Sequence, residues 1–219
     1  MAWIGARARP RPAGRPGALR LNLRLSSGMR VGLYGGSFNP AHSGHVHVSE
    51  TARRRLGLDR VIWLVSRQNP LKPAAQARFA ARVAGARELV RGRATQVSDA
   101  EVRLRSTFTI DTLRLLKARY PAVRFVWIMG ADSLAGLAAW RDWSGIFREV
   151  PVAVVARPGM TLKSLLAPAP RKFSHARLPG GAGLRLAASR PPAWIYLTAP
   201  WNFASSTALR NLPDRAGQS

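Results

Sequence analysis

The sequence predicts a single α/β domain in which helices cover both faces of a parallel sheet, the doubly wound, Rossmann-like arrangement. From Arg30 onward, short apolar runs alternate with helix-like stretches, and this alternation is typical of parallel sheets. The chain has 219 residues and is 47% hydrophobic, which is enough for one core. Ligands of such sheets collect at the carboxyl ends of the strands, so we expect function in the loops that follow them.

Each predicted strand is a short apolar run bounded by turn-forming residues. In chain order the strands are residues 31–34, 60–65, 95–97, 125–129, 152–156 and 194–197. The predicted helices end near residues such as Gly57 and Pro121, which terminate helices. They comprise residues 45–56, 78–91, 109–119 and 132–140, and a last helix that begins near Ser205 or Ser206. Residues 160–190 are rich in Pro, Gly and Ala with weak periodicity, which predicts a variable loop region.

The first 28 residues differ in composition from the rest of the chain. They contain six arginines, three prolines and no acidic residue, so we expect them to be disordered. They can be a basic arm, an Arg-rich transit peptide, or sequence upstream of a translation start at Met29. The last interpretation is favoured, because an apolar strand begins directly after Met29. The domain is then expected to span residues 29–212, followed by a tail at 213–219.

Charge and cysteine content restrict the partners and the compartment. A net charge of +25 suggests a polyanion partner, but the arginines are scattered rather than gathered, so we expect no specific nucleic acid. Loose, salt-sensitive association with RNA remains compatible with this charge. No apolar stretch reaches the roughly 18 residues of a spanning helix, so we expect no membrane partner. The absence of cysteine excludes disulfides and Cys-based zinc sites and fits a cytoplasmic protein. Nothing in the sequence predicts the oligomeric state.

The loop after the first strand carries the strongest functional signal. Residues 35–45 read Gly-Gly-Ser-Phe-Asn-Pro-Ala-His-Ser-Gly-His. Gly35 and Gly36 let backbone N–H groups approach a phosphate, and His45 stands at a helix start, where the dipole favours anions. His42 and His45 can both face one phosphate chain. A lone histidine or a glycine pair has simpler explanations, in a core or a tight turn, but the complete string favours a polyphosphate site.

Two other loops carry groups that suit phosphate. Lys72 lies in a proline-bounded loop, where it can neutralise phosphate or, equally well, be a solvated lysine. Residues 205–207, Ser-Ser-Thr, indicate helix N-caps first, but hydroxyls and N–H groups at a helix start also bind anions. Arg210, one turn further, can point its guanidinium at the same phosphate. We therefore expect Arg210 and the two histidines to bind one polyphosphate.

The string at residues 36–45 resembles the His-x-Gly-His signature of the nucleotidyltransferase superfamily. From about Met29 to Asn211 the chain resembles the bacterial nicotinate-nucleotide adenylyltransferases. Residues 107–112, 130–134 and 205–210 are similar to three further strings of that family. Two departures are mild: Asn39 stands where the family commonly has Asp, and Phe108 where it usually has Tyr.

The resemblance implies which residues bind each substrate. ATP would be bound by Gly35, Gly36, Ser37, Phe38, His42, His45, Gly130, Asp132, Ser205, Ser206, Thr207 and Arg210. Nicotinate mononucleotide would be bound by Asn39, Lys72, Thr107, Phe108, Thr109, Asp132 and Trp140. The catalytic set would be His42, His45, Lys72 and Arg210. From the residues alone, Thr109 and Asp132 are equally well explained as helix N-caps and Trp140 as a core residue, and Glu101 receives no role.

The implied reaction is adenylyl transfer from ATP to nicotinate mononucleotide, giving nicotinate adenine dinucleotide and pyrophosphate in NAD biosynthesis. It requires alignment and charge neutralisation rather than a covalent nucleophile. Mg²⁺ would arrive with ATP, without a metal site in the protein. The alternatives are a sister adenylyltransferase acting on nicotinamide mononucleotide or pantetheine phosphate, and a non-catalytic basic protein that binds RNA. A dehydrogenase is disfavoured, because no Gly-x-Gly-x-x-Gly opens the first helix.

Overall fold

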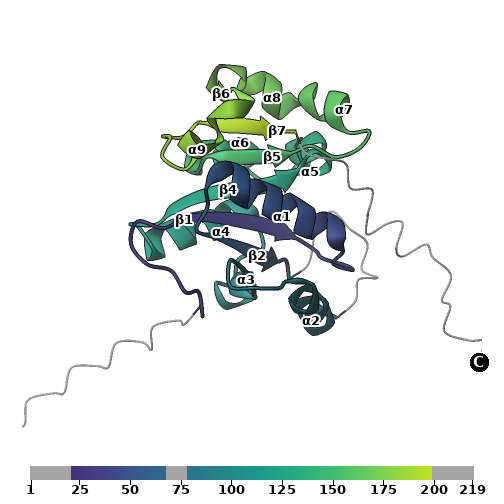
Figure 1. Cartoon of the computed structure of the whole chain (residues 1–219), viewed down its shortest axis with the longest axis vertical. Coiled ribbons are helices and arrows are strands. Elements are labelled where there is room, and N and C mark those ends of the chain that lie inside the picture. Colours follow the sequence, from purple (N-terminus) through teal and green to yellow (C-terminus); the bar gives the residue numbers. More distant parts are fainter. Residues whose placement is uncertain (1–20, 68–77, 199–219) are drawn as a thin grey trace, which may run out of the picture.

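The computed structural model describes residues 21–67 and 78–198, and these form a seven-stranded sheet in which every neighbouring pair is parallel. The strands are β1 (Arg30–Gly36), β2 (Arg60–Val65), β3 (Thr95–Ser98), β4 (Arg124–Gly130), β5 (Val152–Val155), β6 (Arg177–Leu178) and β7 (Trp194–Leu197). Their order across the sheet is β3-β2-β1-β4-β5-β7-β6, with helices on both faces (Figure 1). The predicted doubly wound α/β fold is therefore confirmed.

The helices of the described residues range from one turn to four. The α-helices are α1 (Ser43–Leu56), α2 (Phe79–Leu89), α3 (Ala100–Arg103), α4 (Thr109–Arg119), α5 (Ala131–Ala135), α6 (Trp143–Glu149), α7 (Thr161–Leu165), α8 (Pro168–Lys172) and α9 (Gly183–Leu186). The 3₁₀ helices are η1 (Leu137–Ala139), η2 (Ser174–Ala176) and η3 (Gly180–Ala182).

The sheet changes its direction of growth between β1 and β4. From β1 the chain adds β2 and β3 on one side, then crosses to β4 and continues through β5 and β7 on the other side. A crevice forms at the carboxyl ends of the strands where such a reversal occurs. Because the strands are parallel, the loops after β1, β4 and β5 all open at this edge (Figure 1).

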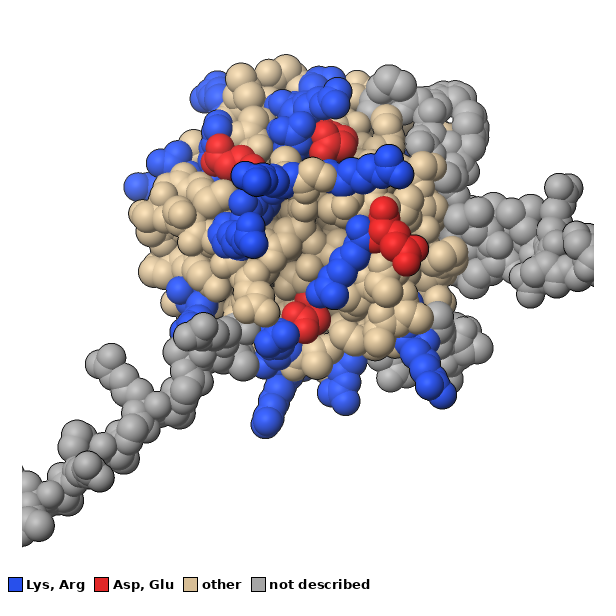
Figure 2. Space-filling model, turned by 60° about the horizontal axis from the view of Figure 1, so that its bottom comes forward, with Lys and Arg blue, Asp and Glu red and all other residues tan. Residues whose placement is uncertain are grey.

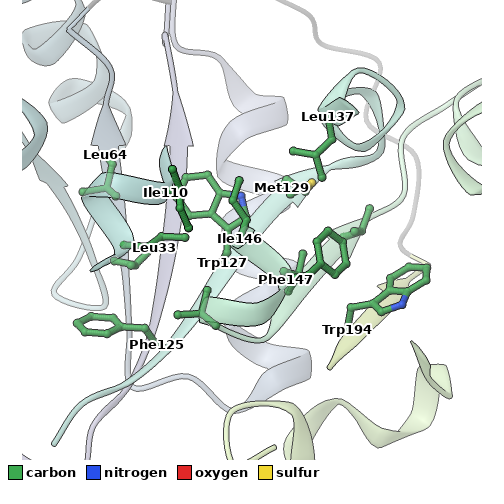
Figure 3. Close-up of a cluster of buried hydrophobic side chains, with 14 of the residues drawn as sticks. Leu33, Leu64, Ile110, Phe125, Trp127, Met129, Leu137, Ile146, Phe147 and Trp194 are labelled. Atoms are coloured by element: carbon green, nitrogen blue, oxygen red, sulfur yellow. The ribbon is translucent and has the colours of Figure 1, made fainter. Parts of the chain in front are cut away.

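Residues along each strand alternate between two buried hydrophobic layers. In β4, Phe125 and Trp127 face the layer that contains α4 and α6, whereas Val126 and Ile128 face the layer that contains α1. Figure 3 shows the first layer, with the Trp127 indole at its centre next to Ile110 of α4. Both faces of the sheet are covered, which explains why its central strands are continuous apolar runs in the sequence.

Helix α1 begins two residues before the predicted start, because His42 is its N-cap. Its carboxyl end is as predicted: Gly57 is the C-cap, with φ 60°, a left-handed conformation that glycine adopts without a steric penalty. The last turn carries three arginines, residues 53–55, whose charge complements the helix dipole at that end.

The predictions were wrong where elements are short. Residues 160–190 form no variable loop region but a series of short elements from α7 to α9, each too brief to show a helical period in the sequence. The helix predicted at 132–140 is instead α5 followed by η1, with Gly136 between them. The sequence analysis also missed α3 and α6, of four and seven residues.

The expectation of disorder over residues 1–28 is wrong for residues 21–28. The Leu21 side chain is only 2% exposed and belongs to the core layer of α4. Gln96 Nε2 donates to the Asn22 carbonyl over 2.7 Å, and Gly28 N donates to the Ala122 carbonyl over 2.8 Å. The apolar residues of this short segment had no recognisable period, so their burial was not predictable. Residues 1–20 lie outside the described part of the chain.

Basic side chains are distributed across the face shown in Figure 2. Some of them touch one another, and acidic side chains lie beside several of them. Salt bridges of this kind include Arg30 with Asp59 at 3.2 Å and Arg103 with Asp99 at 2.8 Å. Among the described residues, no helix has the length and apolarity needed to cross a membrane.

Candidate active site

The end of β1 and the loop after it are shaped by close packing against two tryptophans; Gly35 and Gly36, which the sequence placed in the loop, are the last residues of the strand. A Cβ added at Gly35 would overlap the Trp127 indole, so only glycine fits there without displacing the core. Phe38 has a positive φ of 46°, and its ring stacks on Trp63 with centroids 4.8 Å apart and planes 6° apart. The residues predicted to bind ATP here, from Gly35 to Phe38, therefore sit on a rigid aromatic base.

His42 and His45 lie side by side at the amino end of α1, with ring centroids 3.8 Å apart. Their backbone and side chains form a reciprocal cap: Gly44 N donates to His42 Nδ1 over 3.1 Å, and His42 N donates to His45 Nδ1 over 3.2 Å. A nitrogen that accepts an N–H cannot carry a proton, so in both neutral rings the proton sits on Nε2. The pair therefore presents two Nε2–H donors beside the helix N-terminus, as a polyphosphate site requires.

Burial keeps the His42 imidazole neutral, and aromatic packing fixes the His45 ring. His42 is buried, and burial, assisted by the positive charge of Arg157, lowers its pKa to about 4. His45 packs on the Phe38 ring at 4.9 Å and lies 5.9 Å from the Trp63 ring. Both rings are therefore preorganised before any ligand binds, which is what electrostatic catalysis needs.

Arg157 is a site residue that the sequence analysis missed. It directly follows the strand predicted at 152–156 and is 16% exposed; its Nη1 lies 3.3 Å from Asp132 Oδ2. Its other terminal nitrogen, Nη2, is buried and has no hydrogen-bond partner among the described residues. The charges of Arg157 and Asp132 both act on His42, so the loops after β1, β4 and β5 converge. The other loops were selected because each follows the carboxyl end of a predicted strand, and the same criterion could have selected Arg157.

Asp132 and Gly130 occupy the expected place after β4, but one interpretation of Asp132 was wrong. The N-cap of α5 is Gly130, and the Asp132 carboxylate is engaged by Arg157 instead of capping the helix. A Cβ on Gly130 would collide with that carboxylate. The Asp132 side chain is about half exposed at the carboxyl edge of the sheet, where a carboxylate can accept hydrogen bonds from hydroxyl groups.

The segments expected to bind the acceptor also come together. Thr107 is exposed, and Phe108 and Thr109 are half-buried at the start of α4. The alternative of Thr109 as a side-chain cap is wrong: the N-cap is Phe108, and no side-chain hydrogen bond caps the helix. Arg141, the neighbour of Trp140, lies over the Phe108 ring at 4.5 Å and 3.8 Å from Asp111. These contacts join the start of α4 to the chain around Trp140.

Trp140 connects this acceptor segment to the floor of the site. It is half-buried, and its ring meets the Trp127 indole edge-on with centroids 6.5 Å apart. Trp127 in turn lies directly beneath Gly35. Trp140 is therefore partly buried in the core, in agreement with its interpretation as a core residue, and part of its side chain is exposed to solvent.

Comparison with known proteins agrees with this geometry. The cytidylyltransferase-like family model matches residues 33–212. The chain belongs to this family.

This cytidylyltransferase-like chain covers nearly the whole length of two curated relatives. A probable nicotinate-nucleotide adenylyltransferase of Caulobacter sp. (strain K31) is 63% identical over 183 residues, 83% of this chain and 97% of the relative. One of Methylorubrum extorquens is 51% identical over 183 residues, 83% of this chain and 99% of the relative. The resemblance to the bacterial nicotinate-nucleotide adenylyltransferases is therefore confirmed.

The fold of this cytidylyltransferase-like chain also matches a solved structure. The Plasmodium falciparum nicotinic acid mononucleotide adenylyltransferase complexed with NaAD superimposes with a TM-score of 0.62 at 17% identity. The match covers 83% of this chain and 82% of the parasite enzyme. At this identity the likeness concerns the fold alone.

Several predicted site residues of this cytidylyltransferase-like chain lie outside the described ranges: Lys72, Ser205, Ser206, Thr207 and Arg210. Their roles, and the expected convergence of Arg210 with the histidines, stay predictions. Asn39 is described, in the loop between β1 and α1. Within residues 21–67 and 78–198, no group of three His, Asp or Glu side chains is placed to hold a metal ion.

Proposed function

We propose that this chain transfers the adenylyl group of ATP, bound with Mg²⁺, to nicotinate mononucleotide, releasing pyrophosphate and forming nicotinate adenine dinucleotide for NAD biosynthesis. The observation that carries the proposal is the pair of Nε2–H donors on His42 and His45, placed near the half-buried Arg157 at the reversal point of the sheet. The names of the curated relatives support the same activity.

In the proposed reaction, a phosphate oxygen of the mononucleotide attacks the α-phosphorus of ATP. A new phosphorus–oxygen bond forms as the bond to the β-phosphate oxygen breaks, and pyrophosphate leaves in line with the attack. The chain's own groups need not exchange a proton. His42 and His45 donate hydrogen bonds to the phosphates, and Arg157 offsets negative charge that grows on the leaving group. The Mg²⁺ that accompanies ATP supplies further charge neutralisation.

The acceptor is placed on the Trp140 side of the crevice. Thr107, Phe108 and Thr109 line the start of α4, and Arg141 brings positive charge to the same place. An exposed part of Trp140 can stack on a pyridine ring. Asp132, which lies between the histidine pair and the Trp140 segment, can accept hydrogen bonds from ribose hydroxyls. Arg141 offers a partner for a carboxylate, which distinguishes nicotinate from nicotinamide.

The residues outside the described ranges complete the proposal. The chain leaves β7 at Leu197, at the same sheet edge as the histidines, because β7 is parallel to its neighbours. This supports a role for residues 205–207 and Arg210 at the triphosphate. Lys72 follows β2, the direct neighbour of β1, which supports its place near the same phosphates. A cytoplasmic location belongs to the same proposal and rests on the cysteine-free composition.

The test is a panel of acceptors assayed with ATP and Mg²⁺ for pyrophosphate release. The panel contains nicotinate mononucleotide, nicotinamide mononucleotide and pantetheine phosphate, with a no-acceptor control. We expect turnover to be fastest with nicotinate mononucleotide. Preference for either other acceptor would reassign the substrate, and no turnover together with tight, salt-sensitive RNA binding would favour the non-catalytic alternative.

A further inference from the structure

The Arg82 guanidinium is buried in α2 and bonded to backbone carbonyls of two loops of the site. Its side chain is only 4% exposed. Nη1 donates to the Ser37 carbonyl over 2.6 Å and to the Ser66 carbonyl over 2.9 Å, and Nη2 donates to the Arg67 carbonyl over 2.8 Å. Ser37 belongs to the loop after β1, whereas Ser66 and Arg67 follow β2. One side chain therefore joins the two loops just beyond the end of the sheet.

Glu101 interacts electrostatically with this buried cation and binds the same loop. It lies in α3, is 5% exposed, and accepts a hydrogen bond from the Arg67 backbone N–H. Its charge acts on Arg82 and that of Arg82 acts on Glu101. Arg67 is thus held at both of its backbone groups, its carbonyl by Arg82 and its N–H by Glu101. A buried arginine without such a partner would be strongly unfavourable.

Among the described residues, sheet pairing between the two segments ends here: the last backbone hydrogen bond that joins them runs from Ser66 N to the Gly36 carbonyl, 2.9 Å. The loop after β1 then leads to His42, and the described part of the segment after β2 ends at Arg67. A planar guanidinium can serve three acceptors in fixed directions, whereas a lysine ammonium cannot reproduce that geometry.

We infer that Arg82, together with Glu101, is a positioning residue that fixes the His42 loop relative to the segment that directly follows β2. It acts through the carbonyls of Ser37, Ser66 and Arg67 rather than by touching substrate. The expected effect of Arg82 on kcat rests on the proposed function. The expected coupling of the two loops, measured by hydrogen exchange, does not depend on any activity.

The experiment compares Arg82→Lys and Glu101→Gln with a matched control, Arg87→Lys, which changes an exposed arginine of the same helix. Hydrogen exchange of peptides covering residues 35–42 and 64–67 is measured with kcat and KM for nicotinate mononucleotide and ATP. We expect faster exchange of both peptides in Arg82→Lys and a fall in kcat of about 10- to 100-fold, because small misplacements of aligned groups slow reactions by this order. The Glu101→Gln variant should show a smaller change in the same direction, and the control none.

The outcomes separate the alternatives. A variant with a lower melting temperature but wild-type exchange in both peptides and wild-type kcat would show that Arg82 is merely structural, and would overturn the inference. If Arg82→Lys does not fold, the Glu101→Gln variant decides by the same two readouts. If the wild type shows no turnover, the proposed function fails, yet loop exchange still tests the coupling.

Discussion

Arg157 Nη1 lies 3.3 Å from Asp132 Oδ2, and this pair joins the carboxyl ends of β5 and β4 beside the His42 imidazole. The pair has two effects: it fixes the position of the Arg157 guanidinium, and it leaves one of its nitrogens for another acceptor. Asp132 holds the guanidinium at the carboxyl edge of the sheet, while the second terminal nitrogen of Arg157 is buried and has no hydrogen-bond partner among the described residues. A buried donor without a partner is costly in a resting protein, so this nitrogen is well placed for an anionic oxygen.

Replacing Arg157 by Met should therefore lower kcat/KM on the order of 10²-fold, the range for losing one preorganised donor. It should also raise the pKa of His42 from about 4, although burial, the larger cause, will keep it below 6.5. Pyrophosphate release and an NMR titration of the His42 ring measure the two effects. Arg148→Met, at an exposed position of α6, is the control. An unchanged His42 titration would contradict the electrostatic link.

Replacing His45 by Ala should cost a factor on the order of 10²–10³ in kcat, because one preorganised Nε2–H donor disappears. The matched control is His175→Ala, which removes an exposed imidazole in η2. Both variants are assayed for pyrophosphate release at saturating substrates. Turnover of the His45 variant equal to that of the control would remove His45 from the mechanism.

Glu101 should make stability depend on pH in an unusual direction. Burial raises its pKa from 4.5 to about 7, so the folded protein binds this proton more tightly than the unfolded chain. Its contribution to stability is therefore fully present below pH 4.5 and is lost as the pH rises through 7. The loss amounts to about 3 kcal/mol. Urea unfolding at several pH values gives the free energy of unfolding of the wild type and of Glu101→Gln, and the difference between the two measures the loss. A difference that stays constant between pH 4.5 and 7 would contradict the prediction.

The sequence predicted the central strands and the phosphate loop because each has a strong local signal. The strands of β1, β2 and β4 are apolar on both faces, and residues 35–45 combine glycines with a histidine pair. Glu101 and Arg82 had no such signal, because their electrostatic interaction joins residues of two different helices and arises only in the folded chain. The elements between α7 and α9 were missed for a different reason: none is long enough to establish a period.

Replacing Trp140 by Ala should raise KM for nicotinate mononucleotide several-fold more than KM for ATP, because the ring that stacks on the pyridine is lost. The Trp140→Phe variant keeps an aromatic face and should retain most of the affinity. Trp143→Ala, at a half-buried position of α6 packed on Phe173, is the control for general destabilisation. Equal increases in both KM values would show that Trp140 supports the fold without contacting the acceptor.

Two glycine-to-alanine changes should have opposite effects on stability. At Gly35 the new methyl group would overlap the Trp127 indole, so Gly35→Ala forces the core tryptophan to move and should cost about 1–3 kcal/mol. The displacement should also reach Trp140, which rests edge-on against Trp127, and so lower affinity for the acceptor. At Gly85, inside α2, nothing lies within 4 Å of the added methyl group, and the change should stabilise the protein by about 0.5–1 kcal/mol. Chemical unfolding of both variants, together with KM for nicotinate mononucleotide, gives the comparison. If Gly35→Ala is as stable and active as wild type, the end of β1 does not depend on its contact with Trp127, and the rigid aromatic base inferred for the phosphate site is wrong.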